Sequence, residues 1–234
     1  MEEIAILMAA GLGTRMKPMT ERVPKPLIPV LGKPMIETII EGLICRGISK
    51  VFVIVGYKKE QFRYLINKYH VVSLVENTEY LTKNNISSIY AVCNILGRSN
   101  CFICEADLYI PDPLIFKADL KHSCYFGKMV CGHSDDWIFD MDTSGRIIRI
   151  GKGGDNVFNM VGISYFEKDD ARKISLAIQN KYKFPGHEQL FWDEVVDEHL
   201  SEMDIYIHPI QDKEVVEIDT ISELKEVEKN YSRN

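Results

Sequence analysis

A glycine turn and two cationic side chains lie close together near the start of this 234-residue sequence. The apolar run at 4–10 ends at Gly11 and Gly13, and Arg15 and then Lys25 follow, with Lys25 between two prolines. Because glycine lacks a Cβ atom, Gly11 and Gly13 can adopt positive φ and let backbone N–H groups approach an anion closely. The planar guanidinium of Arg15 suits phosphate oxygens, and Lys25 supplies a point charge on a segment that the proline rings stiffen. These residues predict a cradle for a polyphosphate.

The turn fits neither of two common phosphate-binding glycine motifs. A Walker A loop has Lys and then Ser or Thr directly after its last glycine, and a dinucleotide fingerprint has a third glycine and an immediate helix. Here Gly13 leads into a segment rich in proline. Taken alone, a Gly-x-Gly sequence after a strand is also compatible with a simple tight turn.

The spacing of the whole segment is more specific than the glycines alone. The glycines are followed by Thr14-Arg15, Pro18, Thr20 and Pro24-Lys25-Pro26-Leu27. This pattern resembles the signature of nucleotidyltransferases, which join a nucleoside triphosphate to a phosphorylated metabolite and release pyrophosphate. The resemblance implies that Arg15 meets the distal phosphates and Lys25 the α-phosphate. It also implies nucleotide contacts from Ala10, Gly11, Gly13 and Thr14.

Two carboxylates follow predicted strands that are far apart in the sequence. Asp107 comes after the apolar run 101–106, and Asp219 ends the alternating run 215–219. Carboxylates at the ends of two strands suit Mg²⁺, which prefers carboxylate, water and phosphate oxygens. In the resembling enzymes two aspartates at such places hold the metal. The alternative for Asp219 is the N-cap of a helix expected at 221–230.

A polar cluster precedes another expected helix. Asn84, Asn85 and Ser87 supply amides and a hydroxyl at its start, which suits the edge of a pyrimidine and its ribose. Plain N-capping is the alternative interpretation, because a single Asn is enough to cap a helix. In cytidylyltransferases a similar Asn-Asn segment, followed by Ser and Tyr, occupies the matching place.

Both tryptophans of the protein lie beside acids, which indicates a site for an ammonium group. Aromatic faces backed by carboxylates bind ammonium ions through cation–π attraction and charge. The alternative is that both indoles are anchors of the core. The candidate acceptor-binding residues are Asp136, Trp137, Phe191, Trp192, Asp193 and Glu217.

From the glycine turn to residue 228 the sequence is similar to bacterial CTP:phosphocholine cytidylyltransferases of the LicC type and to 2-aminoethylphosphonate cytidylyltransferases. It departs from their pattern at Glu105, where Asp is expected, at Leu108, and at Phe191, where Tyr is expected. The resemblance implies CTP as donor, Mg²⁺ as cofactor and a small amine-bearing phosphate or phosphonate as acceptor. The tryptophans favour phosphocholine slightly over 2-aminoethylphosphonate.

Apolar periodicity places these residues on an α/β fold. In the first half, helices are expected at 35–45, 58–68 and from residue 85, with buried strands at 4–10, 51–55, 71–75 and 101–106. This alternation predicts a parallel sheet whose ligands bind outside the carboxyl ends of the strands. In the second half, antiparallel strands are expected at 123–131, 137–141, 147–150 and 156–166, and helices at 168–180 and 187–200. The glycine-rich segment 151–155 is expected to be either a turn or a mobile lid.

Composition excludes several other classes of protein. The net charge of −6 argues against a general nucleic-acid binder. The first apolar run is too short for a signal peptide or a membrane span, and the six cysteines stand mostly among apolar neighbours, as reduced thiols do. Cys101 and Cys104 are expected on opposite faces of a strand rather than at a metal or redox site. The sequence thus predicts a cytoplasmic protein without a membrane or nucleic-acid partner, and does not reveal its oligomeric state.

We therefore expect a single Rossmann-like nucleotidyltransferase domain over 1–234, with a mainly parallel mixed sheet and a small antiparallel acceptor lobe. The nucleotide would bind the half at about 1–110 and the acceptor the half at about 111–234. The expected reaction is Mg²⁺-dependent transfer of CMP from CTP to an acceptor such as phosphocholine. The alternatives are a 2-aminoethylphosphonate cytidylyltransferase, a sugar-1-phosphate nucleotidyltransferase and a catalytically silent nucleotide sensor.

Overall fold

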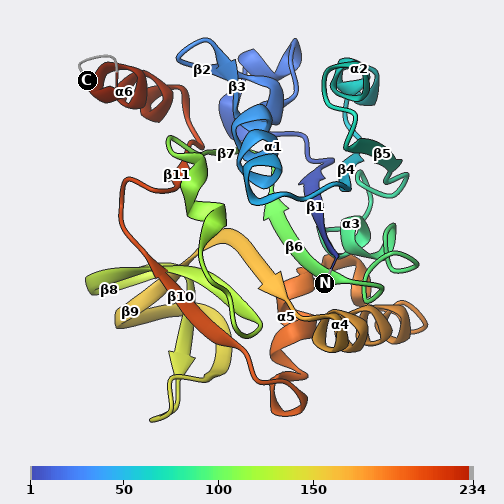
Figure 1. Ribbon diagram of the computed structural model, residues 1–234, viewed down its shortest axis with the longest axis vertical. Helices are drawn as coiled ribbons and strands as arrows, with labels where there is room; N and C mark the ends of the chain where they lie inside the picture. The colour runs from blue at the N-terminus through green and yellow to red at the C-terminus, as the bar shows by residue number, and fades with distance from the viewer. Residues whose placement is uncertain (1, 232–234) are drawn as a thin grey trace.

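The computed structural model describes residues 2–231. At its centre is a seven-stranded sheet with the strand order β10-β8-β9-β6-β1-β4-β5 (Figure 1). Its strands are β1 (Glu3–Ala9), β4 (Val51–Val55), β5 (Val72–Glu76), β6 (Asn100–Glu105), β8 (Cys124–Met141), β9 (Ile147–Phe166) and β10 (Tyr206–Ile210). Two short antiparallel sheets pair β2 (Pro29–Val30) with β3 (Lys33–Pro34) and β7 (Leu108–Tyr109) with β11 (Val216–Glu217).

The first half of the chain forms the parallel part of the sheet, as predicted. Strand β1 lies between β4 and β6 and is parallel to both, and β5 is parallel to β4. The connecting helices include α1 (Met35–Arg46) and α3 (Ile86–Tyr90). Helix α1 ends at Gly47, whose φ of 100° is the left-handed conformation that glycine adopts easily at a helix end.

Hydrophobic side chains of the sheet pack into two clusters. Ala5 and Leu7 of β1 belong to the cluster that contains α1, whereas Ile4 and Ile6 belong to the cluster that contains α4 (Lys168–Lys181) and α5 (Trp192–Asp197). In β6, Cys101 is buried in the second cluster and Cys104 in the first, and both thiols are free. The two thiols thus point to opposite faces of the strand, as predicted.

The second half differs from the prediction because its strands are longer and bent. The expected strands at 123–131 and 137–141 are parts of β8, and those at 147–150 and 156–166 are parts of β9. Segment 151–155 is neither a turn nor a lid, since it pairs with β8 at contacts such as Trp137 with Lys152. Positive φ at Gly132, Gly153 and Asn156 bends the ribbon without ending its pairing.

This antiparallel ribbon folds back on itself and joins the parallel part of the sheet. Ile138 pairs with both Gly151 and Asn159, so β8 lies beside two stretches of β9. Strand β9 is antiparallel to β6, which carries the sheet across both halves of the chain. The edge strand β10 runs parallel to β8.

Two helices are shorter than expected. The segment 58–68 contains a 3-10 turn and then α2 (Tyr64–Lys68), and the segment 187–200 contains a 3-10 turn and then α5 (Trp192–Asp197). Lys58, with φ of 49°, delays the start of the first segment to Lys59, and the extended Phe191 separates the second 3-10 turn from α5. The helices α4 (Lys168–Lys181) and α6 (Ile221–Tyr231) form as predicted. Short 3-10 turns cover Thr14–Met16, Met19–Glu21, Lys25–Leu27, Lys59–Phe62, Pro113–Lys117, His187–Gln189 and Leu200–Glu202.

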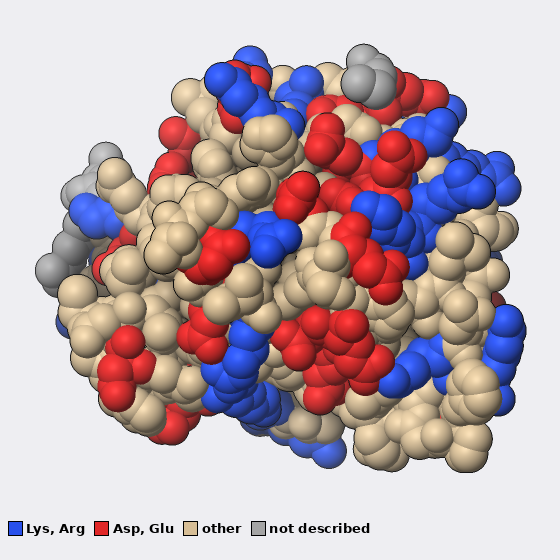
Figure 2. All heavy atoms as spheres, turned by 90° about the horizontal axis from the view of Figure 1, so that it is seen from below, with Lys and Arg blue, Asp and Glu red and all other residues tan. Residues whose placement is uncertain are grey.

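Within residues 2–231 no helix is long and apolar enough to cross a bilayer. On the face shown in Figure 2, acidic and basic side chains lie in small interspersed groups, and neither sign dominates that face.

Candidate active site

Two adjoining cavities open where the carboxyl ends of β1 and β6 meet. The nucleotide-side cavity has a volume of about 300 Å³, and the acceptor-side cavity about 640 Å³. Arg15, Glu105, Glu217 and Asp219 line both of them. The nucleotide-side cavity is also lined by the predicted residues Ala10, Gly11, Gly13, Lys25, Asn84, Asn85, Ser87 and Asp107, whereas Thr14 lies on neither wall. The fold thus brings most of the predicted residues together at one edge of the sheet.

The glycine turn is shaped by its contact with the lysine segment. Gly13 has φ of 60°, and a Cβ atom there would lie 2.8 Å from Cβ of Lys25 and 3.1 Å from Cγ2 of Thr20. The φ of Gly11 is not positive, and no atom lies within 4 Å of the place of its missing Cβ. Gly13 therefore allows the turn to pack on Lys25, while Gly11 leaves open space in front of the cavity.

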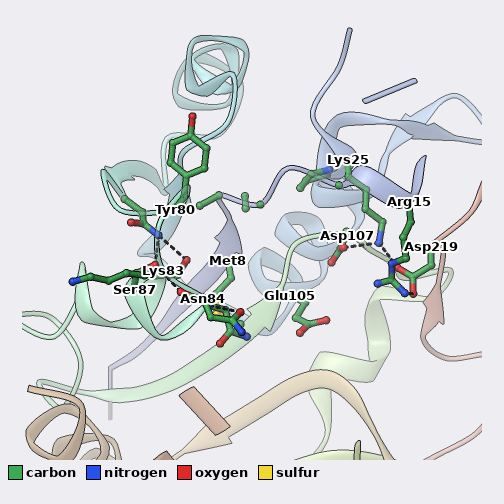
Figure 3. A pocket seen from close by; sticks show the side chains of 18 of the residues that line it. Met8, Arg15, Lys25, Tyr80, Lys83, Asn84, Ser87, Glu105, Asp107 and Asp219 are labelled. Atoms are coloured by element: carbon green, nitrogen blue, oxygen red, sulfur yellow. Dashed lines mark hydrogen bonds and ion pairs between the residues drawn. The ribbon is translucent and has the colours of Figure 1, made fainter. Parts of the chain in front are cut away.

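Lys25 is the centre of a buried charge cluster (Figure 3). Its side chain is only 7% exposed, and Nζ lies 2.6 Å from Oδ2 of Asp107 and 2.7 Å from Oδ1 of Asp219. Arg15 Nη1 lies 2.6 Å from the other oxygen of Asp219. Burial lowers the pKa of the Lys25 ammonium, but the two aspartates outweigh it and hold this pKa above its ordinary value. Lys25 is therefore charged at neutral pH.

The carboxylate of Asp219 is free for this cluster because a different residue caps α6. The hydroxyl of Thr220 accepts from N–H of Glu223, and the Glu223 carboxylate accepts from the N–H groups of Asp219 and Thr220. This reciprocal pattern is a capping box with Thr220 as the cap. The alternative role of Asp219 as side-chain cap is therefore not what the structure shows.

The polar wall of the nucleotide-side cavity is tied together by hydrogen bonds. Nδ2 of the buried Asn77 donates to Oγ of Ser87 and of Ser88, and Ser87 donates to the carbonyl of Asn84. Asn85 does not cap α3 with its side chain; its Oδ1 accepts from N–H of Trp192 instead. Asn85 thus connects α3 to the start of α5, and Asn84 donates to the carbonyl of Gln189 in the preceding 3-10 turn, so the N-cap alternative is wrong.

The wall also contains residues that the sequence did not assign to the site, among them Asn77, Tyr80 and Lys83. Asn77 directly follows β5, and polar residues at strand ends were a usable signal. Tyr80 packs against Gly56, where an added Cβ would lie 2.7 Å from the ring. Lys83 extends over the ring of Tyr182, 4.3 Å from its centroid, a contact between distant segments that spacing along the chain does not reveal.

The acceptor-side cavity contains some of the predicted ammonium-binding residues. Asp136, Trp137, Phe191 and Glu217 line it, and the Trp137 and Phe191 rings meet edge to face at 5.4 Å. Lys152 lies over the Trp137 ring with its Nζ 5.5 Å from the centroid. One aromatic face of the cavity is thus already contacted by a cation of the protein, which the sequence did not indicate.

Trp192 and Asp193 occupy a different place from Trp137. Trp192 is only 3% exposed and packs on Tyr125 and Phe166, so it anchors the core. Asp193 is buried and accepts a hydrogen bond from Tyr125 Oη at 3.0 Å. Burial raises the pKa of Asp193 to about 7. Both residues line a small recess behind the acceptor-side cavity rather than its open wall.

Two further acids stand at the junction of the cavities. Burial, followed by the charges of Asp107, Glu217 and Asp193, raises the pKa of Glu105 well above its ordinary value. Glu217 is exposed, but partial desolvation on the cavity wall and then the charges of Asp219 and Asp107 raise its pKa above the ordinary value. A cation placed beside these groups would lower both pKa values and favour their charged forms.

The aspartate pair has the donor set that Mg²⁺ uses beside a nucleotide. No cluster of three or more His, Cys, Asp or Glu side chains in residues 2–231 has the arrangement of a complete metal site. Mg²⁺ in nucleotide sites is commonly held by one or two carboxylates together with phosphate oxygens and water. Asp107 and Asp219 converge on one ammonium nitrogen beside the glycine turn. They could supply the two protein ligands of such a site, with phosphate and water oxygens as the remaining ligands.

Comparison with known proteins agrees with this architecture. A family model described as nucleotidyl transferase matches residues 4–126. The chain is 53% identical to 2-aminoethylphosphonate cytidylyltransferase of Lancefieldella rimae over 97% of this chain and 92% of that protein. It is 35% identical to choline-phosphate cytidylyltransferase of Streptococcus pneumoniae, over 96% of each chain. The solved structure of the CTP:phosphocholine cytidylyltransferase from Streptococcus pneumoniae superposes with a TM-score of 0.91 at 33% identity, over 99% of this chain and 100% of that one. The chain therefore belongs to the nucleotidyl transferase family, in the branch of the bacterial cytidylyltransferases.

Proposed function

We propose that the protein transfers the cytidylyl group of CTP to 2-aminoethylphosphonate and releases pyrophosphate. The observation that carries this proposal is the convergence of Lys25, Arg15, Asp107 and Asp219 at the junction of two cavities. A triphosphate on one side of the junction and a phosphonate on the other would meet at this cluster.

The reaction needs positioning and charge neutralisation more than acid–base chemistry. The phosphonate oxygen is already an anion and attacks the α-phosphorus of CTP in line with the departing pyrophosphate. Lys25 neutralises charge on the α-phosphoryl group, and Arg15, whose side chain is 70% exposed, swings from Asp219 to the distal phosphates. No covalent intermediate with the protein is required.

Asp107 and Asp219 would hold Mg²⁺ together with phosphate oxygens of CTP. The metal, when bound, supplies further positive charge at the α-phosphate. Lys25 and Arg15 then turn from the aspartates toward the phosphates. Asn84, Asn85 and Ser87 face the place of the base and ribose, and we assign them the selection of cytosine.

Two observations favour the phosphonate over phosphocholine, which the sequence had favoured slightly. The relative with 53% identity is a 2-aminoethylphosphonate cytidylyltransferase. In addition, Lys152 contacts the Trp137 face, and Trp192 is buried, so fewer aromatic faces are open to a trimethylammonium group. Phosphocholine is the second candidate, because Trp137 and Phe191 still line the cavity and the 35% identical relative acts on choline phosphate.

A pyrophosphate-release assay tests the proposal directly. CTP, UTP, ATP and GTP are each incubated with 2-aminoethylphosphonate, phosphocholine, phosphoethanolamine or glucose-1-phosphate. We expect turnover only with CTP and an amine-bearing acceptor, and only with a divalent metal. Turnover with glucose-1-phosphate would identify a sugar-1-phosphate enzyme, and absence of turnover with every pair would identify a silent sensor.

The buried free thiols suit the reducing cytoplasm, where we place the protein.

A further inference from the structure

Glu105 stands at the point where the cavities of the active site meet. It is the last residue of β6 and lines the nucleotide-side cavity, the acceptor-side cavity and the small recess that Trp192 closes. In Figure 3 it lies near Asp107, but none of the ion pairs of the Lys25 cluster reaches it. The Glu105 carboxylate is therefore available to a molecule that occupies the acceptor side.

The charges at this junction do not balance within the protein. Lys25 and Arg15 neutralise Asp107 and Asp219. In residues 2–231 neither Glu105 nor Glu217 forms an ion pair with a lysine or arginine, and Glu105 accepts no hydrogen bond. Glu217 is exposed and Glu105 is half-buried, so of the two it is Glu105 that combines restricted access to water with the lack of a partner. A cation from the substrate would supply the missing partner.

Packing fixes the place of the Glu105 carboxylate. Gly162 of β9 has φ of 74°, and a Cβ atom there would lie 2.9 Å from Oε2 and 3.2 Å from Cβ of Glu105. Most of the recess is apolar, with Met8, Met160 and Trp192 on its wall, although Asp193 and Ser164 also line it. Low polarity around a carboxylate strengthens its attraction for a cation that enters.

The surroundings suit a primary ammonium better than a trimethylammonium. A primary ammonium has N–H donors that a carboxylate can accept, whereas a trimethylammonium has none and depends on aromatic faces. The Trp137 face is contacted by Lys152, and Trp192 is buried against Tyr125. The cavity thus offers the substrate a carboxylate, while its aromatic wall is reduced to Phe191 and to Trp137, which Lys152 already contacts.

We propose that Glu105 receives the primary ammonium of the acceptor beside Gly162 and thereby selects it over a trimethylammonium. This inference rests on the proposed function, and it assigns specificity to a residue outside the set predicted from the sequence. Asp193 and Glu217 flank the same place, but Asp193 is already bonded to Tyr125.

A thermodynamic cycle tests the proposal by binding rather than turnover. The ligands are 2-aminoethylphosphonate and n-propylphosphonate, in which a methyl group replaces the ammonium. Their dissociation constants are measured by calorimetry for wild type and Glu105→Gln in the presence of Mg²⁺ and a non-hydrolysable CTP analogue. We expect wild type to prefer the amine at least tenfold and Glu105→Gln to lose most of this preference. Glu105→Asp, which keeps the charge but shortens the side chain, should lose less of it.

The controls separate a specific loss from a general one. Asp204→Asn removes an exposed charge that pairs with Arg146 and should leave the preference unchanged. In pyrophosphate release, Glu105→Gln should lower kcat/KM for phosphoethanolamine at least tenfold more than for phosphocholine. An undiminished preference in the folded Glu105→Gln variant, or no preference in wild type, overturns the proposal. Preference for the amine without turnover would instead refute the proposed function and leave the role of Glu105 in place.

Discussion

Lys25 is held by two carboxylates in the ligand-free protein, yet the proposed reaction needs its charge at a phosphoryl group. Its ammonium is buried and lies within 2.7 Å of both Asp107 and Asp219. A ligand-free lysine in this position is pre-positioned for its task and loses little entropy when phosphate arrives. If the same aspartates exchange the ammonium for the proposed metal, the cluster would link metal binding to phosphate binding.

The first prediction concerns this charge. Lys25→Ala should lower kcat by about 100-fold or more, the usual effect of removing one donor that acts in the transition state. The KM for CTP should change only a few-fold, because many other groups hold the nucleotide. Steady-state pyrophosphate release at saturating CTP measures both quantities, and Lys33→Ala, at an exposed lysine, serves as control. Weak CTP binding with normal turnover would make Lys25 a binding residue only.

The second prediction concerns the metal. Asp107→Asn and Asp219→Asn should each raise the Mg²⁺ concentration needed for half-maximal activity at least several-fold, because each removes a charged ligand. The fold should persist, since both side chains lie at the cavity and outside the hydrophobic clusters. Activity titrations with Mg²⁺ and circular dichroism check the two statements. Superimposable titrations for wild type and both variants would exclude this aspartate pair as the metal site.

At the scale of the elements, the two glycines of the first turn have different tasks. Gly13→Ala should lower the free energy of unfolding by about 1–2 kcal/mol for the left-handed backbone alone, and the 2.8 Å approach to Lys25 should add to that loss. Gly11→Ala is the matched control, because its added methyl group meets nothing within 4 Å. Urea unfolding measures both variants. Equal stability of the two would show that the turn does not need the clearance at Gly13.

Helix α5 carries a buried acid whose protonation should affect stability. The folded-state pKa of Asp193 is raised by burial to about 7, whereas an unfolded aspartate titrates near pH 3.9. The folded chain thus holds a proton that the unfolded chain releases, and the resulting stability is complete below about pH 4 and is lost as the pH rises to about 7. Each pH unit between these values removes about 1.4 kcal/mol.

Asp193→Asn should remove this dependence, because an amide does not titrate and can still accept from Tyr125. In urea unfolding between pH 5 and 8, the variant should gain stability relative to wild type up to about pH 7 and then run parallel to it. Asp204→Asn, at an exposed acid, controls for the loss of a charge. Curves that stay parallel from pH 5 upward would mean that Asp193 is ionised throughout.

The elements that the sequence predicted well are those whose signals are local. The apolar runs of β1, β4 and β6 and the amphipathic pattern of α1 ending at Gly47 need no partner to be recognised. The ribbon of β8 and β9 was misread because glycine is a common sign of a loop, whereas here it bends strands that remain paired. The role of Asn85 was predicted wrongly because its side-chain oxygen accepts a hydrogen bond from N–H of Trp192, a residue far away in the sequence.

At the scale of the whole molecule, the sequence identified the charged residues of the site better than its aromatic residues. Arg15, Lys25, Asp107 and Asp219 could be predicted because each ends a strand or follows a turn at one edge of the sheet. Trp137 and Trp192 both stand beside acids, and nothing local separates them. Only the packing of the folded-back ribbon against α5 places Trp137 on a cavity wall and Trp192 in the core.

This difference gives the last prediction. Trp192→Ala should lower the free energy of unfolding by about 3–5 kcal/mol, as removal of a buried aromatic side chain does. Trp137→Ala should change stability much less, because its ring is only partly buried, but should lower kcat/KM for phosphocholine by about 1–2 kcal/mol of cation–π energy. For 2-aminoethylphosphonate the loss in Trp137→Ala should be smaller, since a primary ammonium relies on carboxylates. Urea unfolding and pyrophosphate release with both acceptors measure these effects, and Phe184→Ala, at an exposed ring, is the control. If Trp137→Ala proved the more unstable variant, or Trp192→Ala proved fully stable with only its acceptor use impaired, the division between cavity wall and core would be wrong.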